Sequence, residues 1–281
     1  MKREWAQKGR ALTDDIRESL PGKNELFAWY IGQVGFVLKG AETICIDPFL
    51  NDLTDENGNS LRLYENGLPA DALKPDYVIC THGHDDHLAL PTLEKIAASC
   101  GSTRFIVPGA CIEKLTRIGI PPERIIEMRT DCTVRAGSLS IRPIRAAHPV
   151  EETDAAGRET DVCLSMELNG VRVMHLGDTY LTHALLEALT QEERPDVLFL
   201  PINGGDYFRT ARSCIGNLNA REAAILARIL KAGVCVPTHF DAIRGNTADP
   251  LDFVRLLWEE DPAARIRLPA LGERLFFRKE K

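Results

Sequence analysis

The segment that most limits what this chain can fold into is Thr81-His82-Gly83-His84-Asp85-Asp86-His87, which follows an apolar run. Three of the chain's seven histidines lie within positions 82–87. Residues two apart on an extended backbone point to the same side, so His82 and His84 can face one cation. Asp86 and His87 are neighbours whose side chains diverge toward a second position. Imidazole with carboxylate suits zinc, manganese or iron, and the lack of nearby sulfur argues against a purely structural zinc site.

Three more residues of the same kinds follow apolar runs elsewhere in the chain. His148 comes after the run 139–144, Asp178 after 171–176, and His239 after 234–238. A strand that ends on such a residue carries it to the rim of its sheet, where several strands can contribute to one site. The order of these residues therefore predicts a metal centre at a sheet edge.

Short β-branched or aromatic runs are interspersed with segments of helical periodicity. We predict strands at 27–31, 36–39, 43–47, 77–81, 105–107, 139–144, 162–168, 171–176, 197–201 and 234–238. We predict helices at 90–99, 110–118, 181–189, 220–231 and 251–259. Asn169-Gly170 indicates a tight hairpin, and Asn219 with Glu222 indicates a capped helix start. Because strands come first in meander-like groups, we expect mixed sheets with helices on their outer faces.

The chain shows no repeat and no linker rich in proline or serine, so we expect one domain over 1–281. Residues 1–24 are predicted to form a helical N-terminal extension, since 5–20 has the spacing of an amphipathic helix. This helix can cap its own sheet or a neighbouring subunit, which leaves a homo-oligomer open. Long loops are predicted at 51–69 and 203–217, and loops of such length are commonly functional.

Composition excludes several classes of protein. With 34 Lys and Arg against 41 Asp and Glu, the net charge is −7, and no basic arm favours nucleic acid as a partner. No apolar run approaches the roughly 20 residues that cross a bilayer, so we expect no membrane partner. The charged first ten residues are not followed by a signal-peptide core, which predicts a cytoplasmic protein. The eight cysteines form no C-x-x-C pair and are expected as buried thiols.

The pattern His82-x-His84-x-Asp86-His87, continued by His148, Asp178 and His239, resembles the five-motif signature of the metallo-β-lactamase superfamily. The resemblance runs from about 27 to about 243. It implies an α+β fold, a four-layer αββα sandwich with two divalent cations at one edge between the sheets. The first cation would be held by His82, His84 and His148, the second by Asp86, His87 and His239, with Asp178 bridging. Asp47 matches the signature's non-ligand aspartate and would orient a ligand from behind.

Within the superfamily, the chain is most similar to the L-ascorbate-6-phosphate lactonase group, in the stretches 29–38, 175–179 and 237–241. This likeness implies a metallo-hydrolase that opens a lactone or a related small cyclic ester, phosphorylated or not, with a metal-bound hydroxide. It favours manganese, then zinc, and leaves iron open. Asp86 is expected to be the catalytic proton acceptor as well as a ligand.

Other polar side chains are candidates for supporting roles. His175 matches a position of the lactonase group and is expected behind the ligands, with ordinary packing as the alternative. The candidate substrate contacts are Tyr180, His183, Arg209 and Arg212. The two arginines could bind a phosphate or carboxylate, and the tyrosine could donate to a substrate oxygen. Ordinary packing or surface positions are the alternatives for all four.

Three other functions stay open at this point. A small-molecule phosphodiesterase could use the same dinuclear site. A metal-dependent sensor without turnover is disfavoured because every ligand position is filled. Iron-based oxygen chemistry is a further alternative, although 281 residues show no appended flavin domain.

Overall fold

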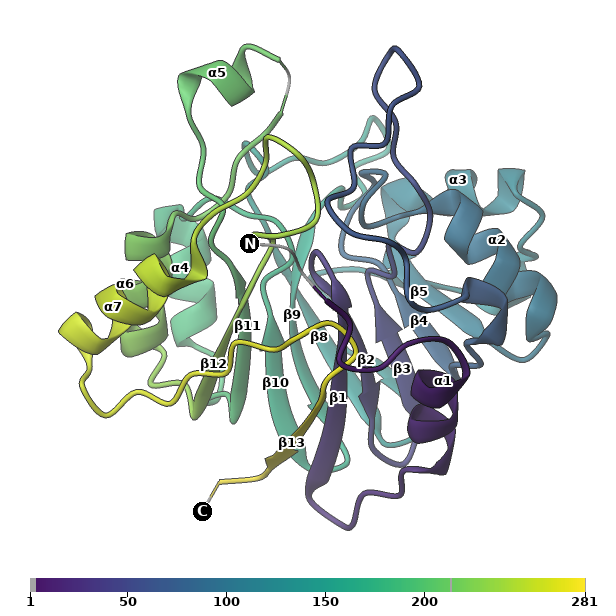
Figure 1. The fold of residues 1–281 in the computed structure, drawn as a ribbon, viewed down its shortest axis with the longest axis horizontal. Helices are drawn as coiled ribbons and strands as arrows, with labels where there is room; N and C mark the ends of the chain where they lie inside the picture. Colours follow the sequence, from purple (N-terminus) through teal and green to yellow (C-terminus); the bar gives the residue numbers. More distant parts are fainter. Residues whose placement is uncertain (1–3, 213, 281) are drawn as a thin grey trace.

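The computed structural model describes residues 4–212 and 214–280, which form two mixed β-sheets with helices outside them (Figure 1). The first sheet has the order β13 (Arg274–Arg278), β1 (Glu25–Gly32), β2 (Gly35–Lys39), β3 (Thr43–Ile46), β4 (Tyr77–Ile79), β5 (Arg104–Pro108) and β6 (Ile125–Met128). The second sheet has the order β12 (Val234–Thr238), β11 (Val197–Pro201), β10 (Val171–His175), β9 (Val162–Leu168), β8 (Leu139–Arg145) and β7 (Val134–Ala136).

Each sheet combines parallel and antiparallel pairs, as the grouping of the strands predicted. In the first sheet, β3, β4, β5 and β6 run parallel to one another, whereas the pairs β13–β1, β1–β2 and β2–β3 are antiparallel. The predicted hairpin joins β9 to β10 with Leu168 opposite Val171. Its two turn residues, Asn169 and Gly170, have φ of 54° and 82°, the left-handed conformation that such a turn requires.

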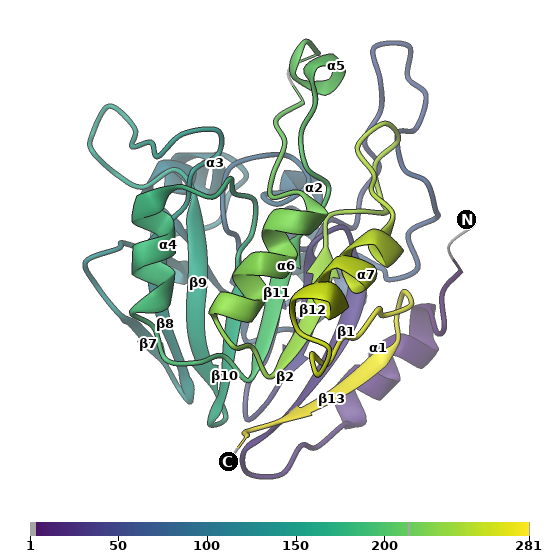
Figure 2. The ribbon, with the colours of Figure 1, turned by 90° about the vertical axis from the view of Figure 1, so that its left-hand side faces the viewer.

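Helices cover the outer face of each sheet (Figures 1 and 2). The first sheet is covered by α1 (Gly9–Glu18), α2 (Leu90–Ser99) and α3 (Ile112–Arg117), and the second by α4 (His183–Thr190), α6 (Ala220–Ile229) and α7 (Pro250–Glu260). The short α5 (Tyr207–Thr210) lies within the predicted loop 203–217, and the single-turn 3₁₀ helices are η1 (Ala70–Ala72), η2 (Gly109–Cys111) and η3 (Pro122–Arg124). As predicted, Asn219 and Glu222 cap the start of α6 reciprocally.

Three apolar clusters hold the four layers together. One lies between the two sheets, where the rings of Phe36 and Phe199 are 4.4 Å apart. The other two lie between each sheet and its helices. Of the eight cysteines expected to be buried, five are, at positions 45, 80, 111, 163 and 235. The expectation was wrong for Cys132, which is exposed, and for Cys100 and Cys214, which are half-buried. This layering confirms the αββα sandwich.

Some predicted boundaries were wrong, for local reasons. Strands β6, β7 and β13 were not predicted, because they are three to five residues long and partly exposed. The helix predicted at 5–20 begins only at Gly9, since Trp5 forms a β-bridge with Leu271. The helix predicted at 181–189 begins at His183, because the side chain of Thr182 caps it. Over the described residues, no helix combines the length and apolarity that a membrane crossing needs.

Candidate metal centre

The predicted ligands meet at one edge of the sandwich, with both sheets contributing. Asp47 and the segment 82–87 follow β3 and β4 of the first sheet. His148, Asp178 and His239 follow β8, β10 and β12 of the second. These connections therefore place residues from five parts of the chain between the two sheets.

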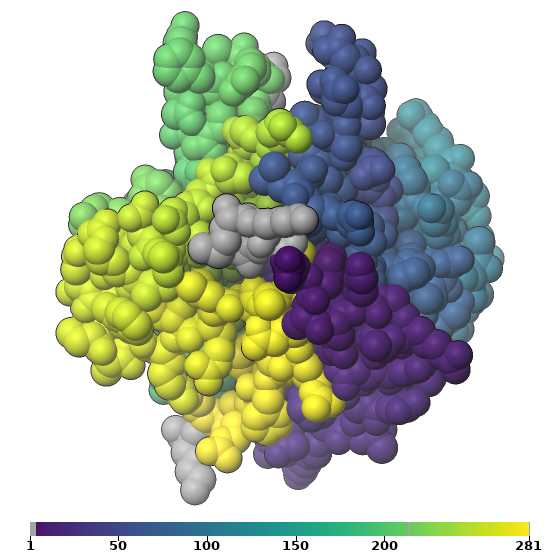
Figure 3. Space-filling view, in the orientation of Figure 1, coloured from purple at the N-terminus to yellow at the C-terminus, as the bar shows by residue number. Residues whose placement is uncertain are grey.

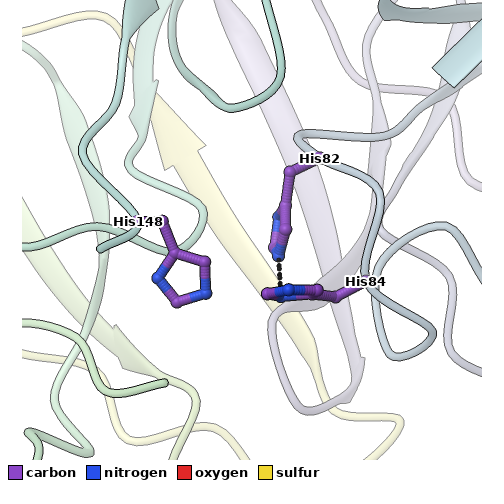
Figure 4. Close-up of side chains that lie close together, drawn as sticks. All are labelled: His82, His84 and His148. Carbon is purple, nitrogen blue, oxygen red and sulfur yellow. Dashed lines mark hydrogen bonds between the residues drawn. The ribbon is translucent and has the colours of Figure 1, made fainter. Parts of the chain in front are cut away.

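Three histidines form the first cluster. Figure 4 shows the rings of His82, His84 and His148 facing one another. The Nε2 atom of His82 lies 2.9 Å from Nδ1 of His84, and the ring of His148 lies 5.2 and 5.0 Å from these two rings. One nitrogen from each ring lies within 4.8 Å of the others. Burial lowers the pKa of His82 well below its ordinary value and that of His148 to about 4. Both rings are therefore neutral near pH 7, the form that binds a cation.

The second cluster contains Asp86, His87 and His239. Oδ2 of Asp86 lies 3.7 Å from Nε2 of His87 and 3.5 Å from Nε2 of His239. The carboxylate of Asp178 lies between the two clusters. Its Oδ1 is 3.3 Å from His87 Nε2, while its Oδ2 is 3.0 Å from His239 Nε2 and 3.7 Å from His148 Nε2. Asp178 thus lies within 4 Å of histidine nitrogens from both clusters.

Electrostatics differ between the clusters. Burial lowers the pKa of His239, but the carboxylates of Asp178 and Asp86 outweigh it and raise that pKa to about 9. The same carboxylates, with Asp47, raise the pKa of His87 well above its ordinary value against the effect of burial. These charged rings hold the pKa of Asp178 well below its ordinary value although the carboxylate is buried. The second cluster is therefore a set of charged groups, whereas His82 and His148 of the first cluster are neutral near pH 7.

Two buried atoms test whether these residues fit a metal. His87 Nε2 and Asp178 Oδ1 are buried 3.3 Å apart, and beyond this contact neither atom has a hydrogen-bond partner among the described residues. A buried polar atom without a partner costs about 1–3 kcal/mol. Imidazole nitrogen and carboxylate oxygen are ligands for zinc, manganese and iron, so a divalent cation would supply the missing partner for both atoms. The residues present fit such an ion.

Asp47 lies directly behind the second cluster. Its Oδ1 accepts from the backbone N–H of Thr81 at 2.8 Å, and its Oδ2 accepts from the Thr81 hydroxyl at 2.7 Å. Oδ2 is also 2.8 Å from Nδ1 of His87. Because a carboxylate only accepts, Nδ1 of His87 must carry a proton, so in the neutral ring, the form that binds a cation, Nε2 is the unprotonated nitrogen. This placement agrees with the orienting role expected for Asp47.

His175 supports the site from further away. Its ring is buried between the sheets, 5.6 Å from Phe199. Nε2 donates to the carbonyl of Val34 and Nδ1 accepts from the N–H of Gly177, both at 3.1 Å. These contacts fix the turn just before Asp178, and they fully occupy the ring nitrogens. His175 therefore acts on the backbone and not on a ligand side chain.

The four candidate substrate contacts lie in different environments. The hydroxyl of Tyr180 accepts from the N–H of Gly216 at 3.1 Å and thus holds the neck of the loop 203–217. The side chain of His183 is 87% exposed and lies 3.5 Å from Glu187 on α4, so no described contact joins it to the ligands.

The two arginines of this loop also differ. Arg209 is mostly buried and donates to Asp206, to the carbonyl of Asn203 and to Asn246. Its guanidinium is thus used within the loop. Arg212 is exposed, with its Nε donating to the carbonyl of Phe208. Of the two, Arg212 is the one that is exposed to solvent.

Two loops project from the end of the molecule that carries the site. The segment around α5 and the segment 51–62 rise on either side of an open gap in Figure 3. Tyr207 and Phe208 of α5 are 79% and 74% exposed. The loop 203–217 follows β11, the neighbour of β12, and His239 comes directly after β12. The substrate contact expected of this loop stays a prediction.

One residue of the site was not predicted. Gln33, in the turn between β1 and β2, is fully buried, and its Nε2 lies 2.7 Å from Asp86 Oδ2 and 3.1 Å from His239 Nε2. Gln33 lies in the stretch 29–38 that resembles the lactonase group, and within it the residue is a lone amide between Gly32 and Gly35 that joins two apolar strands. That pattern is typical of a tight turn and does not by itself indicate a functional residue.

Comparisons with known proteins agree with this geometry. Residues 42–240 match a family model described as a beta-lactamase superfamily domain. A UPF0173 metal-dependent hydrolase of Archaeoglobus fulgidus is 31% identical over 231 residues, 80% of this chain and 87% of the relative. A probable L-ascorbate-6-phosphate lactonase UlaG of Escherichia fergusonii is 24% identical, over 91% and 80% of the two chains.

A solved structure supports the fold alone. Igni18, a metallo hydrolase from Ignicoccus hospitalis, superimposes with a TM-score of 0.67 at 22% identity, over 91% of this chain and 100% of that one. The family match covers most of the sandwich, including every predicted ligand from His82 to His239. The chain therefore belongs to the beta-lactamase superfamily, together with relatives that are described as metal-dependent hydrolases.

Proposed function

We propose that this protein is a metal-dependent hydrolase that opens a lactone or a related small cyclic ester at a dinuclear centre. The observation that carries the proposal is the convergence of histidine and aspartate side chains in two clusters that share Asp178. Membership of the superfamily supports the hydrolase class, and the likeness to the lactonase relatives supports the narrower substrate class.

Seven side chains of this chain would hold the two cations. The proposed ligands are His82, His84 and His148 for the first ion, Asp86, His87 and His239 for the second, and Asp178 for both. When bound, manganese, zinc or iron would activate a water molecule and polarise the ester oxygen. Asp47 would keep His87 in the tautomer that leaves its Nε2 available.

Asp86 is the carboxylate best placed to move a proton. Its side chain is 15% exposed, compared with 4% for Asp178, so of the two only Asp86 has an appreciable contact with solvent. A carboxylate at the edge of the site can accept a proton and return it to the leaving alkoxide. We assign that role to Asp86, in addition to its role as a ligand.

The first experiment is metal analysis of the purified protein, followed by hydrolysis assays before and after chelation. The panel contains neutral lactones, sugar-phosphate lactones, phosphomonoesters and phosphodiesters. About two equivalents of metal with chelator-sensitive lactone opening would support the proposal. Phosphodiester turnover alone would instead favour a small-molecule phosphodiesterase on the same site. Less than about one equivalent, with no turnover after metal is restored, would refute the dinuclear hydrolase.

The proton-transfer role of Asp86 has its own test. Asp86→Asn should lower turnover more than it lowers metal content, and equal losses would show that Asp86 is only a ligand. Asp85→Asn is the matched control, because it removes the same charge from the adjacent exposed position. This control should leave both quantities close to those of the wild type.

Anion recognition is assigned to the loop 203–217. Arg212→Ala should raise KM for a phosphorylated lactone and leave a neutral lactone unaffected, because the exposed guanidinium would contact only the anionic group. Arg209→Ala removes a guanidinium that is held inside the loop, so it should affect both substrates together. If Arg212→Ala changed KM for both lactones to the same extent, as Arg209→Ala is expected to do, Arg212 would not be a residue of the anion-binding site.

A further inference from the structure

We propose that Gln33 is a positioning residue for the second cation, because its side-chain amide holds Asp86 beside His239, in the arrangement that lets both ligands face one ion. This inference rests on the proposed dinuclear function. Gln33 would not touch the substrate or the reacting atoms, and its effect would pass through the two ligands.

The contacts of the side chain define this role. Nε2 of Gln33 donates to Oδ2 of Asp86 at 2.7 Å and lies 3.1 Å from Nε2 of His239. Because a carboxylate oxygen only accepts, the amide must present its nitrogen to Asp86, which fixes its orientation. Both contacts are with members of the second cluster. A shift of this amide would therefore move the second cluster and leave the three histidines of the first in place.

The main chain of Gln33 makes separate contacts. Its carbonyl oxygen accepts from the N–H of His239 at 2.8 Å and from the hydroxyl of Tyr30 at 3.2 Å. These bonds tie the β1–β2 turn to the segment after β12 independently of the side chain. A substitution that changes only the side chain therefore leaves this connection in place, so the two contributions can be measured apart.

The backbone conformation shows that glutamine is not the residue the turn itself favours. Gln33 has φ of 60° in the left-handed region, where glycine is the least strained residue. Among the described residues, six other than glycine have positive φ. Asn24 and Asn169 are of a type that tolerates it, and Lys231 follows the end of α6.

The remaining three residues with positive φ are Gln33, Asp47 and His239, and all of them lie in or directly behind the second cluster. Backbone strain that persists in a folded protein concentrates at functional sites, where other contacts hold it. A second feature points the same way: Oε1 of Gln33 is buried and makes no hydrogen bond with any described residue. A side chain kept only to stabilise the turn would not leave one end unsatisfied.

The test compares two substitutions that remove the amide in different ways. Gln33→Gly suits the left-handed backbone, whereas Gln33→Met keeps the length of the side chain and removes its hydrogen-bonding groups. Asn24→Gly is the matched control, because it places glycine at another left-handed position away from the site. Each full-length protein is stripped of metal and titrated with Mn²⁺ by calorimetry, and its thermal unfolding is measured without metal.

Both Gln33 variants should bind the second Mn²⁺ about 10- to 100-fold more weakly, the usual effect of losing a group that orients a ligand. Binding of the first ion should stay within about twofold of the wild type by the same reasoning. Metal-free Gln33→Gly should unfold at the wild-type temperature or above, which a purely structural role would not allow. Asn24→Gly should leave both binding steps unchanged.

Three results would overturn the inference, and they are distinguishable. If the wild type binds two ions and both variants do so with unchanged affinity, Gln33 is not a positioning residue and the proposed function stands. If the wild type itself binds fewer than two ions, the dinuclear function fails and this inference fails with it. If both ions bound more weakly by the same factor and the unfolding temperature fell, Gln33 would have only a structural role.

Discussion

Lowering the pH from 8 to 6 is expected to release a cation from the second cluster while the first cluster keeps its own. The reason lies in the opposite pKa shifts of the histidines. His239 has its pKa raised to about 9 by Asp178 and Asp86 against the effect of burial, so in the metal-free protein it carries a proton throughout this range. A cation that uses Nε2 of His239 must displace that proton.

The size of the effect follows from this competition. For one displaced proton with a pKa of about 9, the apparent Kd is multiplied by 1 + 10^(9 − pH), which is about 11 at pH 8 and about 1000 at pH 6. The second site should therefore weaken about 100-fold over these two pH units. His87, whose pKa is also raised, can only make the dependence steeper. His148, with a pKa of about 4, is about 99% unprotonated at pH 6, so its proton hardly competes.

The assay is a calorimetric titration of metal-free protein with Mn²⁺ at pH 6, 7 and 8, repeated in buffers of different ionisation enthalpy. The second binding step should release one or more protons at pH 7 and lose affinity as the pH falls. The first step should change far less. If the two steps weakened equally, or if the second released no protons, the charged state assigned to the second cluster would be wrong.

Three other perturbations follow from single contacts. Phe199→Ala should lower the free energy of unfolding by about 3–5 kcal/mol in urea titrations, because the ring packs between the sheets; a loss below about 1 kcal/mol would contradict that packing. Asp47→Asn should weaken the second cation about 10- to 100-fold with unchanged circular dichroism, since it removes the charge that faces His87; an unchanged affinity would count against the orienting role. Gly177→Ala should lower both Tm and metal content, because φ at this position is 55° and an added Cβ would lie 2.9 Å from Cβ of Thr81. A variant with the wild-type Tm and metal content would show that the added Cβ causes no strain.

The ligand cluster could be predicted from the sequence because its signals are local. The segment 82–87 concentrates cation-binding residue types behind a recognisable strand, and His148, Asp178 and His239 each follow another strand. The two sheets and their helices were predictable for a similar reason, since periodicity over five to ten residues fixes most elements. Strand β13 carried no such signal, because an edge strand alternates exposed and buried residues over a very short span.

Residues whose role depends on contacts distant in sequence were harder to predict. Arg209 is of a residue type that often binds anions. In the structure its guanidinium is instead bonded to Asn203 and Asn246, and these bonds form only when two loops that are distant in sequence meet. For Gln33 the sequence underestimated the role of the residue, whereas for Arg209 it overestimated it. The neighbours of Gln33 in sequence indicate an ordinary turn, while its functional contacts are with residues 53 and 206 positions away.

The burial and charge of the two clusters also bear on how the site would be filled. The neutral histidines His82 and His148 need lose no proton to bind a cation near pH 7, so these two rings keep their charge when the first cluster is occupied. In the second cluster, protons on His87 and His239 balance the carboxylates of Asp86 and Asp178. A cation that enters there replaces those protons. The negative charge of Asp178 is then balanced by the ion instead of by the protonated histidines. Because Asp178 also faces His148, filling one cluster changes the electrostatic environment of the other. The two ions should therefore bind in a fixed order, the first cluster before the second.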